Sequence, residues 1–234
     1  MFLNDLILKP ITQLFFPTLC HACSNELLSN EHLICNYCMS TLQKTNFHLV
    51  ISNPVEEKLF GRVKFENATS IFYFSKKSKV QHLIHHFKYK KNIALGQLLA
   101  RMMAKQLELY RWASDIQVIV PLPLSSQKLK WRGFNQSEII ASEIGVRLNI
   151  PVNNSDLVRI KNTSSQTKKS NLERIQNVQN AFSLNNLKAF ENKHVLLIDD
   201  IITTGATIES CIHTLNQVHN CKVSVLSIAY ATDL

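Results

Sequence analysis

The amino-acid sequence predicts an α/β fold, in which helices cover both faces of a parallel sheet, preceded by a small cysteine-rich module. Apolar runs that suit buried strands alternate with segments of helical periodicity over residues 69–234, a pattern typical of parallel sheets. Four of the six cysteines form two C-x2-C pairs within residues 20–38. We therefore expect three parts: an N-terminal helix and four-cysteine module over 1–45, a linker or loose segment over 46–68, and the α/β domain over 69–234.

The elements of the α/β domain follow from local patterns. Apolar, β-branched and aromatic runs predict strands over 69–74, 115–124, 194–202 and 222–231. Apolar residues at helical spacing predict helices over 80–87, 93–109, 135–150 and 206–218. Asn135 or Ser137 is the expected N-cap of the third of these helices. Residues 40–68 are polar and show little periodicity, which is why a loose segment is expected there.

The N-terminal stretch and the charge limit the location and the partners of the protein. Residues 1–20 are apolar but are interrupted by Asn4, Asp5, Lys9 and Pro10, so they form no continuous signal-peptide core. No stretch reaches the roughly 18 apolar residues of a membrane span, and we expect a cytoplasmic protein. The formal net charge of +9 indicates an anionic partner, either a phosphorylated small molecule or a nucleic acid.

The paired cysteines predict a structural zinc site. Each C-x2-C pair places two thiolates on one tight turn, and two such turns supply four sulfur ligands for tetrahedral zinc. The ligands are Cys20, Cys23, Cys35 and Cys38. Disulfides would need an oxidising compartment, and a thioredoxin-like site uses a single pair. A closed four-sulfur site leaves no open coordination position, so this zinc is expected to support structure.

The stretch VLLIDDIITTGAT, residues 195–207, predicts a phosphate and sugar site at the carboxyl end of a strand. Asp199 and Asp200 end the apolar run, where they can accept hydrogen bonds from sugar hydroxyls or hold Mg²⁺. The residues around Gly205 begin a helix, and backbone N–H groups there bind phosphate. Ligands of open parallel sheets bind at this edge, which residues 121–124 also reach. The sequence has neither GxxxxGK[ST] nor GxGxxG. The alternative is a capped helix beside two solvated acids.

These residues resemble a known family. The stretch 195–207 is similar to the phosphoribosyl pyrophosphate (PRPP) motif of type I phosphoribosyltransferases. The order of the segments resembles the ComF/GntX family more narrowly: two cysteine pairs, then FKYKKNIALGQLLA (87–100), VPLPLSSQKLKWRGFNQSEIIA (120–141), residues 157–184 and the PRPP motif. The resemblance implies a type I phosphoribosyltransferase-like sheet and a zinc-ribbon-like module, and it covers nearly the whole chain except 40–68.

The resemblance also implies roles for individual residues. Asp199 and Asp200 would contact the ribose hydroxyls, and the 5′-phosphate would lie against Thr203, Thr204, Gly205, Ala206 and Thr207. The turn Leu122, Pro123 and Leu124 would hold pyrophosphate, with Lys128, Lys130 and Arg132 as nearby cations. Residues 159–177 correspond to the mobile loop that closes over PRPP, with the cations Arg159, Lys161, Lys168, Lys169 and Arg174. Arg132, Arg174 and Asp200 are the expected catalytic residues.

Two hypotheses of function follow. The first is an enzyme that binds PRPP and Mg²⁺ and transfers phosphoribose through an oxocarbenium-like state to an unidentified acceptor, for which Tyr89 or Phe134 could stack a base. The second is a non-catalytic competence accessory protein that binds single-stranded DNA or a protein partner and uses PRPP as a regulatory ligand. Residues 76–91 hold six lysines and no acidic residue, which is compatible with DNA binding. Because the PRPP motif lies far from the cysteines in sequence, ligand binding is expected to survive loss of the zinc.

Overall fold

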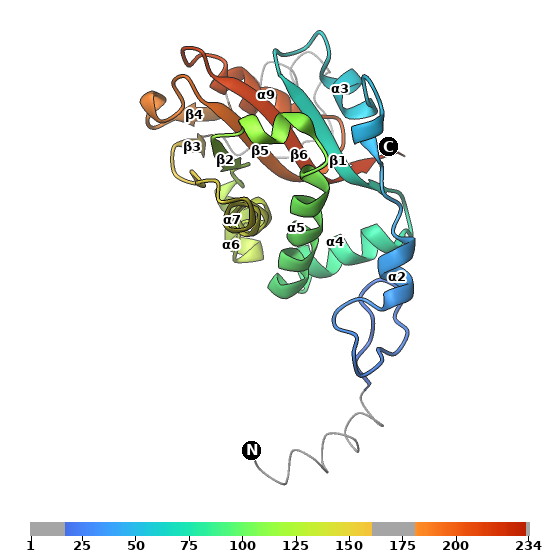
Figure 1. The fold of residues 1–234 in the computed structure, drawn as a ribbon. Coiled ribbons are helices and arrows are strands. Elements are labelled where there is room, and N and C mark those ends of the chain that lie inside the picture. The colour runs from blue at the N-terminus through green and yellow to red at the C-terminus, as the bar shows by residue number, and fades with distance from the viewer. Residues whose placement is uncertain (1–16, 161–180, 233–234) are drawn as a thin grey trace, which may run out of the picture.

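The structure, a computed structural model, describes residues 17–160 and 181–232 (Figure 1). The N-terminal helix expected within residues 1–16 lies outside the described residues. So do Lys161, Lys168, Lys169 and Arg174 of the basic segment. Within the described ranges, no helix is long and apolar enough to span a membrane.

A four-stranded parallel sheet forms the centre of the molecule (Figure 1). Its strands lie in the order β1 (Asn67–Phe74), β6 (Lys222–Ala231), β5 (His194–Ile202) and β2 (Val118–Pro121). All three neighbouring pairs are parallel, with Ile198 opposite Leu226 on one side and Pro121 on the other. The carboxyl ends of the strands therefore meet at one edge, as the predicted site requires.

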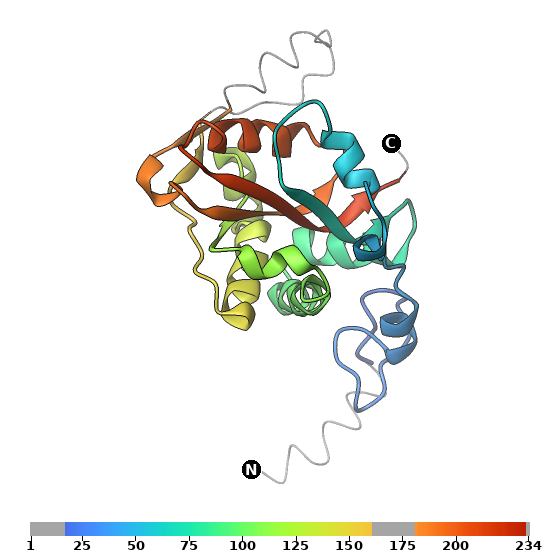
Figure 2. The ribbon, with the colours of Figure 1, turned by 45° about the horizontal axis from the view of Figure 1, so that its top comes forward.

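Helices pack on both faces of this sheet, and they build two apolar clusters. On one face lie α4 (Lys79–Tyr89), α5 (Ile93–Leu107) and α7 (Gln136–Leu148), and on the other lies α9 (Ala206–Leu215) (Figures 1 and 2). Successive residues of β5 enter opposite clusters, since Ile198 belongs to the first and Leu197 to the second. Both residues are fully buried. The predicted parallel α/β class is confirmed.

The predicted elements of the α/β domain are present, with shorter ends in places. The strand expected over 115–124 is only Val118–Pro121, because the 3₁₀ turn η2 (Arg111–Asp115) precedes it and a loop follows it. The helix α7 begins after Asn135, whose side chain accepts a hydrogen bond from the N–H of Ser137, so the first of the two expected caps is the one used.

Residues 46–68 differ from the loose segment expected there. They contain the 3₁₀ turn η1 (Phe47–Leu49) and the helix α3 (Pro54–Leu59). A capping box joins Asn53 and Glu56 at the start of α3, and Val55 and Leu59 are fully buried one helical turn apart. Two apolar residues in six are too few to show a period in the sequence, and the helix is stabilised by packing on the sheet.

Three further elements were not expected from the sequence. A short helix, α6 (Ser126–Arg132), follows β2, and the strands β3 (Leu157–Arg159) and β4 (Phe182–Leu184) form an antiparallel hairpin. At the other end of the molecule, the cysteine module with α2 (Asn36–Thr41) packs against α4 and joins the first apolar cluster. These pieces are short, and their positions depend on contacts with distant parts of the chain.

Candidate phosphoribosyl site

The predicted site forms where β5 and β2 end side by side. The N–H of Leu122 donates to the carbonyl of Ile198 at 2.9 Å, so the turn Leu122–Pro123–Leu124 lies next to Asp199 and Asp200. The side chain of Asn135 donates to the carbonyl of Leu122 at 3.2 Å and holds this turn from the start of α7. The structure therefore brings together two segments that lie almost 80 residues apart in the sequence.

The two adjacent acids contact different partners. Asp200 is buried and accepts a charge-assisted hydrogen bond from Lys88 of α4, with 2.7 Å between Nζ and Oδ1. Asp199 accepts from the N–H of Asp200 at 2.7 Å, and its charge acts on Arg159 at the end of β3. Neighbouring side chains of a strand point to opposite faces of the sheet. The carboxylates of Asp199 and Asp200 can therefore contact a ligand from opposite sides.

The environment of Asp199 favours its protonated form. Burial is the main cause, and the negative charge of Asp200 adds to it; together they raise the pKa of Asp199 to about 7. The N–H of Asp200 and the positive charges of Lys88 and Lys128 oppose this shift. A bound cation, or a ligand that donates hydrogen bonds, would therefore meet a carboxyl group that titrates near neutral pH.

Positive charge gathers around the acids. The pKa of Lys128 is lowered, first by loss of solvation and then by the nearby charges of Arg132, Arg159 and Lys88. Four cations from three elements, α4, α6 and β3, thus lie close together at this edge of the sheet. Like charges held close together repel, and an anionic ligand would relieve that repulsion.

Arg132 is held in place and has one unmet donor. Its Nη1 donates to Oε1 of Gln136 at 2.7 Å, and Gln136 is completely buried. Its guanidinium lies over the ring of Tyr89, 5.5 Å from the ring centroid. Across the described part of the chain, the Nε of Arg132 is the buried side-chain nitrogen that has no hydrogen-bond acceptor. Such a donor is expected to find an oxygen of a ligand.

The loop Thr203–Thr207 has the geometry of a phosphate cradle. It connects β5 to α9, and Gly205 takes the N-cap position with φ +78°, in the left-handed region that glycine adopts readily. Gly205 has no side chain to cap the helix, and the N–H of Ala206 has only a long hydrogen bond of 3.5 Å to Oγ1 of Thr204, so the N–H groups at the start of α9 are open to a ligand. A small hollow of about 30 Å³ lies here, lined by Asp199 and residues 201–208.

The helix α3 and the turn that follows it support this loop from outside. Lys58 Nζ donates to the carbonyl of Thr203 at 2.5 Å, and Arg62 Nη1 donates to the carbonyl of Thr204 at 3.1 Å. Arg62 also forms an ion pair with Glu209 of α9. A side chain at Gly205 would meet Leu59 at 3.4 Å. Lys58, Arg62 and Lys88 were missed by the sequence analysis, since each is one lysine or arginine among many and its partner lies over 100 residues away.

Aromatic residues lie beside the site. The rings of Tyr89 and Trp131 are 5.5 Å apart, and both side chains are well exposed, Trp131 at 68%. Phe134 instead packs against the buried Phe87, with 5.7 Å between the ring centroids. Of the two residues expected to stack a base, Tyr89 therefore has the more accessible ring.

The four cysteines of the two pairs come together in the N-terminal module. Their sulfur atoms lie within 4.8 Å of one another, so they could hold one metal ion. The N–H of Cys35 donates to the sulfur of Cys20 at 3.3 Å, and the N–H of Cys38 donates to the sulfur of Cys35 at 3.4 Å. The four are free thiols rather than disulfides. A tight group of four sulfurs fits zinc.

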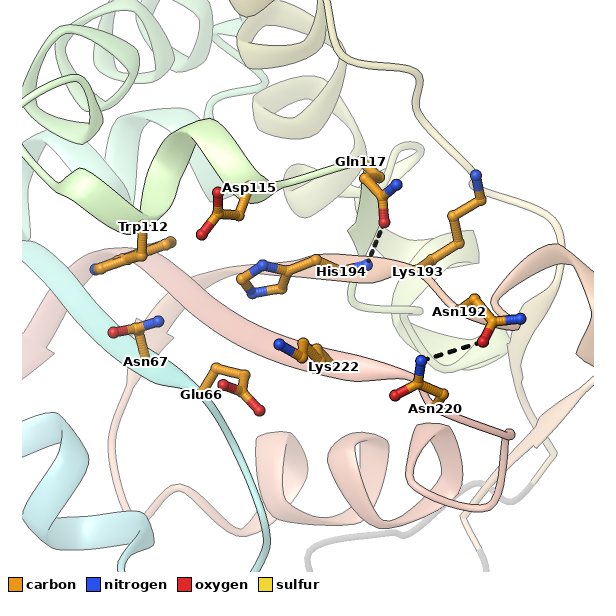
Figure 3. A pocket seen from close by; sticks show the side chains of 10 residues that line it. All are labelled: Glu66, Asn67, Trp112, Asp115, Gln117, Asn192, Lys193, His194, Asn220 and Lys222. Atoms are coloured by element: carbon orange, nitrogen blue, oxygen red, sulfur yellow. Dashed lines mark hydrogen bonds between the residues drawn. The ribbon is translucent and has the colours of Figure 1, made fainter.

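A larger hollow of about 290 Å³ lies at the opposite edge of the sheet, by the amino ends of the strands (Figure 3). Trp112, Asp115 and Lys222 are among the residues that line it. His194 also lines it; burial lowers the pKa of this histidine, and its Nε2 lies 2.9 Å from Oγ of Ser224. None of the predicted site residues among those described borders this hollow.

Comparison with known proteins places the fold and the site in context. The sequence pattern of the phosphoribosyl transferase domain matches residues 89–232, more than half of the chain. Competence protein F of Haemophilus influenzae is 28% identical over 220 residues, which cover 91% of this chain and 90% of that protein. Competence protein ComFC of Bacillus subtilis is 37% identical over 39% of this chain and 35% of its own length. DNA utilization protein YhgH of Salmonella typhimurium is 29% identical over 54% and 56%.

Solved structures show a weaker likeness. Glutamine PRPP amidotransferase of Bacillus subtilis aligns with a TM-score of 0.39 and 21% identity over 57% of this chain, but this chain spans only 26% of that protein. Adenine phosphoribosyltransferase of Leishmania donovani aligns with a TM-score of 0.40 and 12% identity over 89% of this chain and 88% of that protein.

Proposed function

The chain belongs to the phosphoribosyl transferase domain family and is of the ComF type; on this premise we propose that it binds PRPP with Mg²⁺ and transfers the phosphoribosyl group to an acceptor. The observation that carries the proposal is one edge of the sheet where an acid pair, a glycine loop at a helix start and converging cations meet. The 5′-phosphate would lie against Thr203–Thr207, and the ribose hydroxyls would bond to Asp199 and Asp200.

Arg132 supports the diphosphate part of the proposal. Its buried Nε lacks an acceptor within the described residues, while Gln136 and Tyr89 hold its other atoms. A diphosphate oxygen would meet this donor, with Lys128 as the second cation. Asp199 and Asp200 would hold Mg²⁺ directly or through water, since carboxylate oxygens suit this ion. The ion would neutralise part of the charge on the diphosphate.

The proposed reaction breaks the bond between C1 of the ribose and the pyrophosphate oxygen. The bonding electrons leave with pyrophosphate, a nucleophilic atom of the acceptor forms the new bond to C1, and the proton of that atom is released. Arg132 stabilises the charge that develops on the leaving group. Arg174, which lies outside the described residues, is proposed as a further cation with the same role as Arg132 and Lys128. Asp200 orients the ribose for the displacement.

We further propose that the four cysteines hold a structural zinc ion and that the protein acts in the cytoplasm. The distances among the four sulfurs support the first part. A site with four protein ligands has no position for substrate, so the ion would act on the stability of the module.

A second candidate function is binding of single-stranded DNA by a competence accessory protein. The exposed rings of Tyr89 and Trp131 lie next to Arg132, and Lys91 reaches the neighbouring Gly133; such surfaces stack bases while contacting phosphates. The names of the competence and DNA utilization relatives agree with it. In this case PRPP would be a regulatory ligand.

Calorimetry with PRPP and Mg²⁺ tests the first proposal. Asp200→Asn is expected to weaken binding about 10- to 150-fold, because it removes a charge-assisted hydrogen bond. Asp115→Asn, at the opposite edge of the sheet, is the matched control and should bind normally. An Asp200→Asn protein that stays folded and binds PRPP like the wild type would contradict the proposal. Release of pyrophosphate with a panel of nucleobases, amines and DNA then separates an enzyme from a regulatory binder.

Salt dependence distinguishes the second candidate. Binding of single-stranded DNA should weaken steeply as salt rises, and Trp131→Ala should weaken it at low salt. Trp112→Ala removes the same side chain at the far edge and serves as the control. Equal DNA binding by both variants would exclude the Tyr89–Trp131 surface.

A further inference from the structure

The first cysteine pair is attached to α4 and to the corner between α4 and α5. The Nδ1 of His82 donates to the carbonyl of Ala22 at 3.0 Å. The side-chain amide of Asn92 donates to Nε2 of His21 at 2.9 Å, and the rings of His21 and His86 lie 4.7 Å apart. We call residues 20–23 the first knuckle. All three contacts are made by the two central residues of the first knuckle, His21 and Ala22. These residues therefore pack against α4 and the corner that follows it.

The corner that the knuckle holds is rigid. Asn92 is also the N-cap of α5 and accepts from the N–H of Leu95 at 3.0 Å. Gly96 of α5 packs so closely on Phe87 of α4 that a Cβ at this position would lie 2.2 Å from the phenyl ring. The end of α4 and the start of α5 are therefore tightly packed on each other, so a displacement of either would change the position of residues 87–92.

Lys88 lies in this same stretch and reaches the proposed ligand site. Its ammonium group is 2.7 Å from Asp200, and both side chains are only 12% exposed. A charge pair with so little access to water depends strongly on distance and direction. The position of α4 consequently affects the orientation of the Asp200 carboxylate at the end of β5, through its ion pair with Lys88.

We propose that Lys88 is a positioning residue for Asp200 and that the first knuckle, through α4 and Asn92, sets the position of Lys88. The inference rests on the proposed function, and it replaces the expectation that ligand binding survives without the cysteine module. The cysteines and the PRPP motif are far apart in sequence, but one helix of 11 residues, about 16 Å long, connects their sites.

A double-mutant cycle tests the connection. Lys88→Met is expected to weaken binding of PRPP with Mg²⁺ about 10- to 100-fold, and Lys88→Arg should recover part of this loss. His82→Ala, which removes one of the three contacts between the first knuckle and the α4–α5 corner, should cost about 2- to 10-fold. In the double variant, the His82→Ala loss should disappear, because the knuckle acts through Lys88. Purely additive losses, or no recovery by Lys88→Arg, would overturn the proposal.

Controls separate this inference from the proposed function. Lys105→Met on α5 and His213→Ala in the last turn of α9 remove the same groups without a contact to Asp200 or to the knuckle, and both should bind normally. Asn92→Ser is a second knuckle variant, because serine still caps α5 but is too short to reach His21.

If the wild type binds no PRPP, the proposed function fails, but hydrogen exchange still tests the attachment of the first knuckle to α4 and Asn92. His82→Ala and Asn92→Ser should speed exchange over 79–92 with zinc content unchanged. Unchanged exchange would overturn the attachment.

Discussion

At the scale of single residues, the proton on Asp199 connects ligand binding to pH. Its carboxyl group has a pKa raised to about 7 by burial and by Asp200. Below pH 7 the carboxyl group of Asp199 keeps its proton in the folded protein. A cation, or a hydroxyl group that donates a hydrogen bond, must displace this proton in order to bind there. The unfolded chain ionises at an ordinary pKa of 3.8, so the shift lowers the free energy of unfolding as pH rises from about 4 to about 7.

Affinity for PRPP with Mg²⁺ is therefore expected to rise with pH and to level off above about 7. Below that value it should fall by up to about tenfold per pH unit, since one proton is released on binding. Calorimetry at pH 6, 7 and 8, in buffers with different heats of ionisation, measures the proton directly. Asp199→Asn should bind weakly without this pH dependence and should melt at a higher temperature than the wild type at pH 8. A flat wild-type profile would contradict the assignment.

Gly205 shows how one backbone conformation shapes the proposed phosphate loop. Because its φ is +78°, Gly205→Ala is expected to cost about 1–2 kcal/mol in the free energy of unfolding. The new Cβ would make only an ordinary contact with Leu59 of α3, so the weaker phosphate binding expected of this variant would come from the strained φ of the loop. Denaturant unfolding and PRPP titration measure the two effects. Gly61→Ala is the control for the backbone alone, since it also has a positive φ but no atom within 4 Å of the added carbon.

At the scale of elements, α3 and the turn that follows it support the loop between β5 and α9. Lys58 and Arg62 donate to loop carbonyls at Thr203 and Thr204, and the capping box of Asn53 and Glu56 fixes where the helix begins. Carbonyl groups that are turned outward toward α3 leave the N–H groups of the loop directed toward the ligand side.

Arg62→Met is expected to weaken PRPP binding several-fold, by about 0.5–1.5 kcal/mol for one lost hydrogen bond. The melting temperature should change little, because the ion pair of Arg62 with Glu209 is substantially exposed to water. Lys64→Met, nearby and without a contact to the loop, is the control. A variant that melts much earlier than the wild type would show that Arg62 supports the fold instead of the loop.

At the scale of the whole molecule, the cysteine module and the α/β domain share one apolar cluster. Cys20, Cys35 and Cys38 belong to the same buried group as Phe72 and Phe87. Loss of a metal from the module would therefore disturb α4 and the sheet face beneath it, because metal binding and local folding are coupled.

Replacing Cys20 and Cys23 with Ser is expected to remove about one zinc ion per chain and to lower the melting temperature. It should also weaken PRPP binding, through the first knuckle and Lys88. Metal analysis, melting curves and calorimetry give the three readouts. Cys221→Ser changes a cysteine outside the cluster and should keep the metal. Absence of zinc from the reduced wild-type protein would contradict the metal assignment.

The sequence by itself determined the parallel sheet, the cysteine pairs and the stretch 195–207. Each of these is a local pattern: a continuous apolar run indicates a buried strand, C-x2-C indicates a knuckle, and acids followed by TTGAT at a helix start indicate the proposed phosphate loop. Asn135 as the cap of α7 belongs to the same class, since its partner Ser137 is two residues away.

Only the tertiary structure determined which cations lie next to Asp199 and Asp200, and how the cysteine module is connected to these two acids. Lys88 and Asp200 are 112 residues apart, and Lys58 and Thr203 are 145 apart. No short spacing distinguishes these lysines from the many solvated ones, because their partners are chosen by the packing of α3 and α4 on the sheet. The same holds for Asn92, a cap residue, and His21, a histidine between two cysteines. The hydrogen bond between them forms only because the first knuckle packs against α4 and the start of α5.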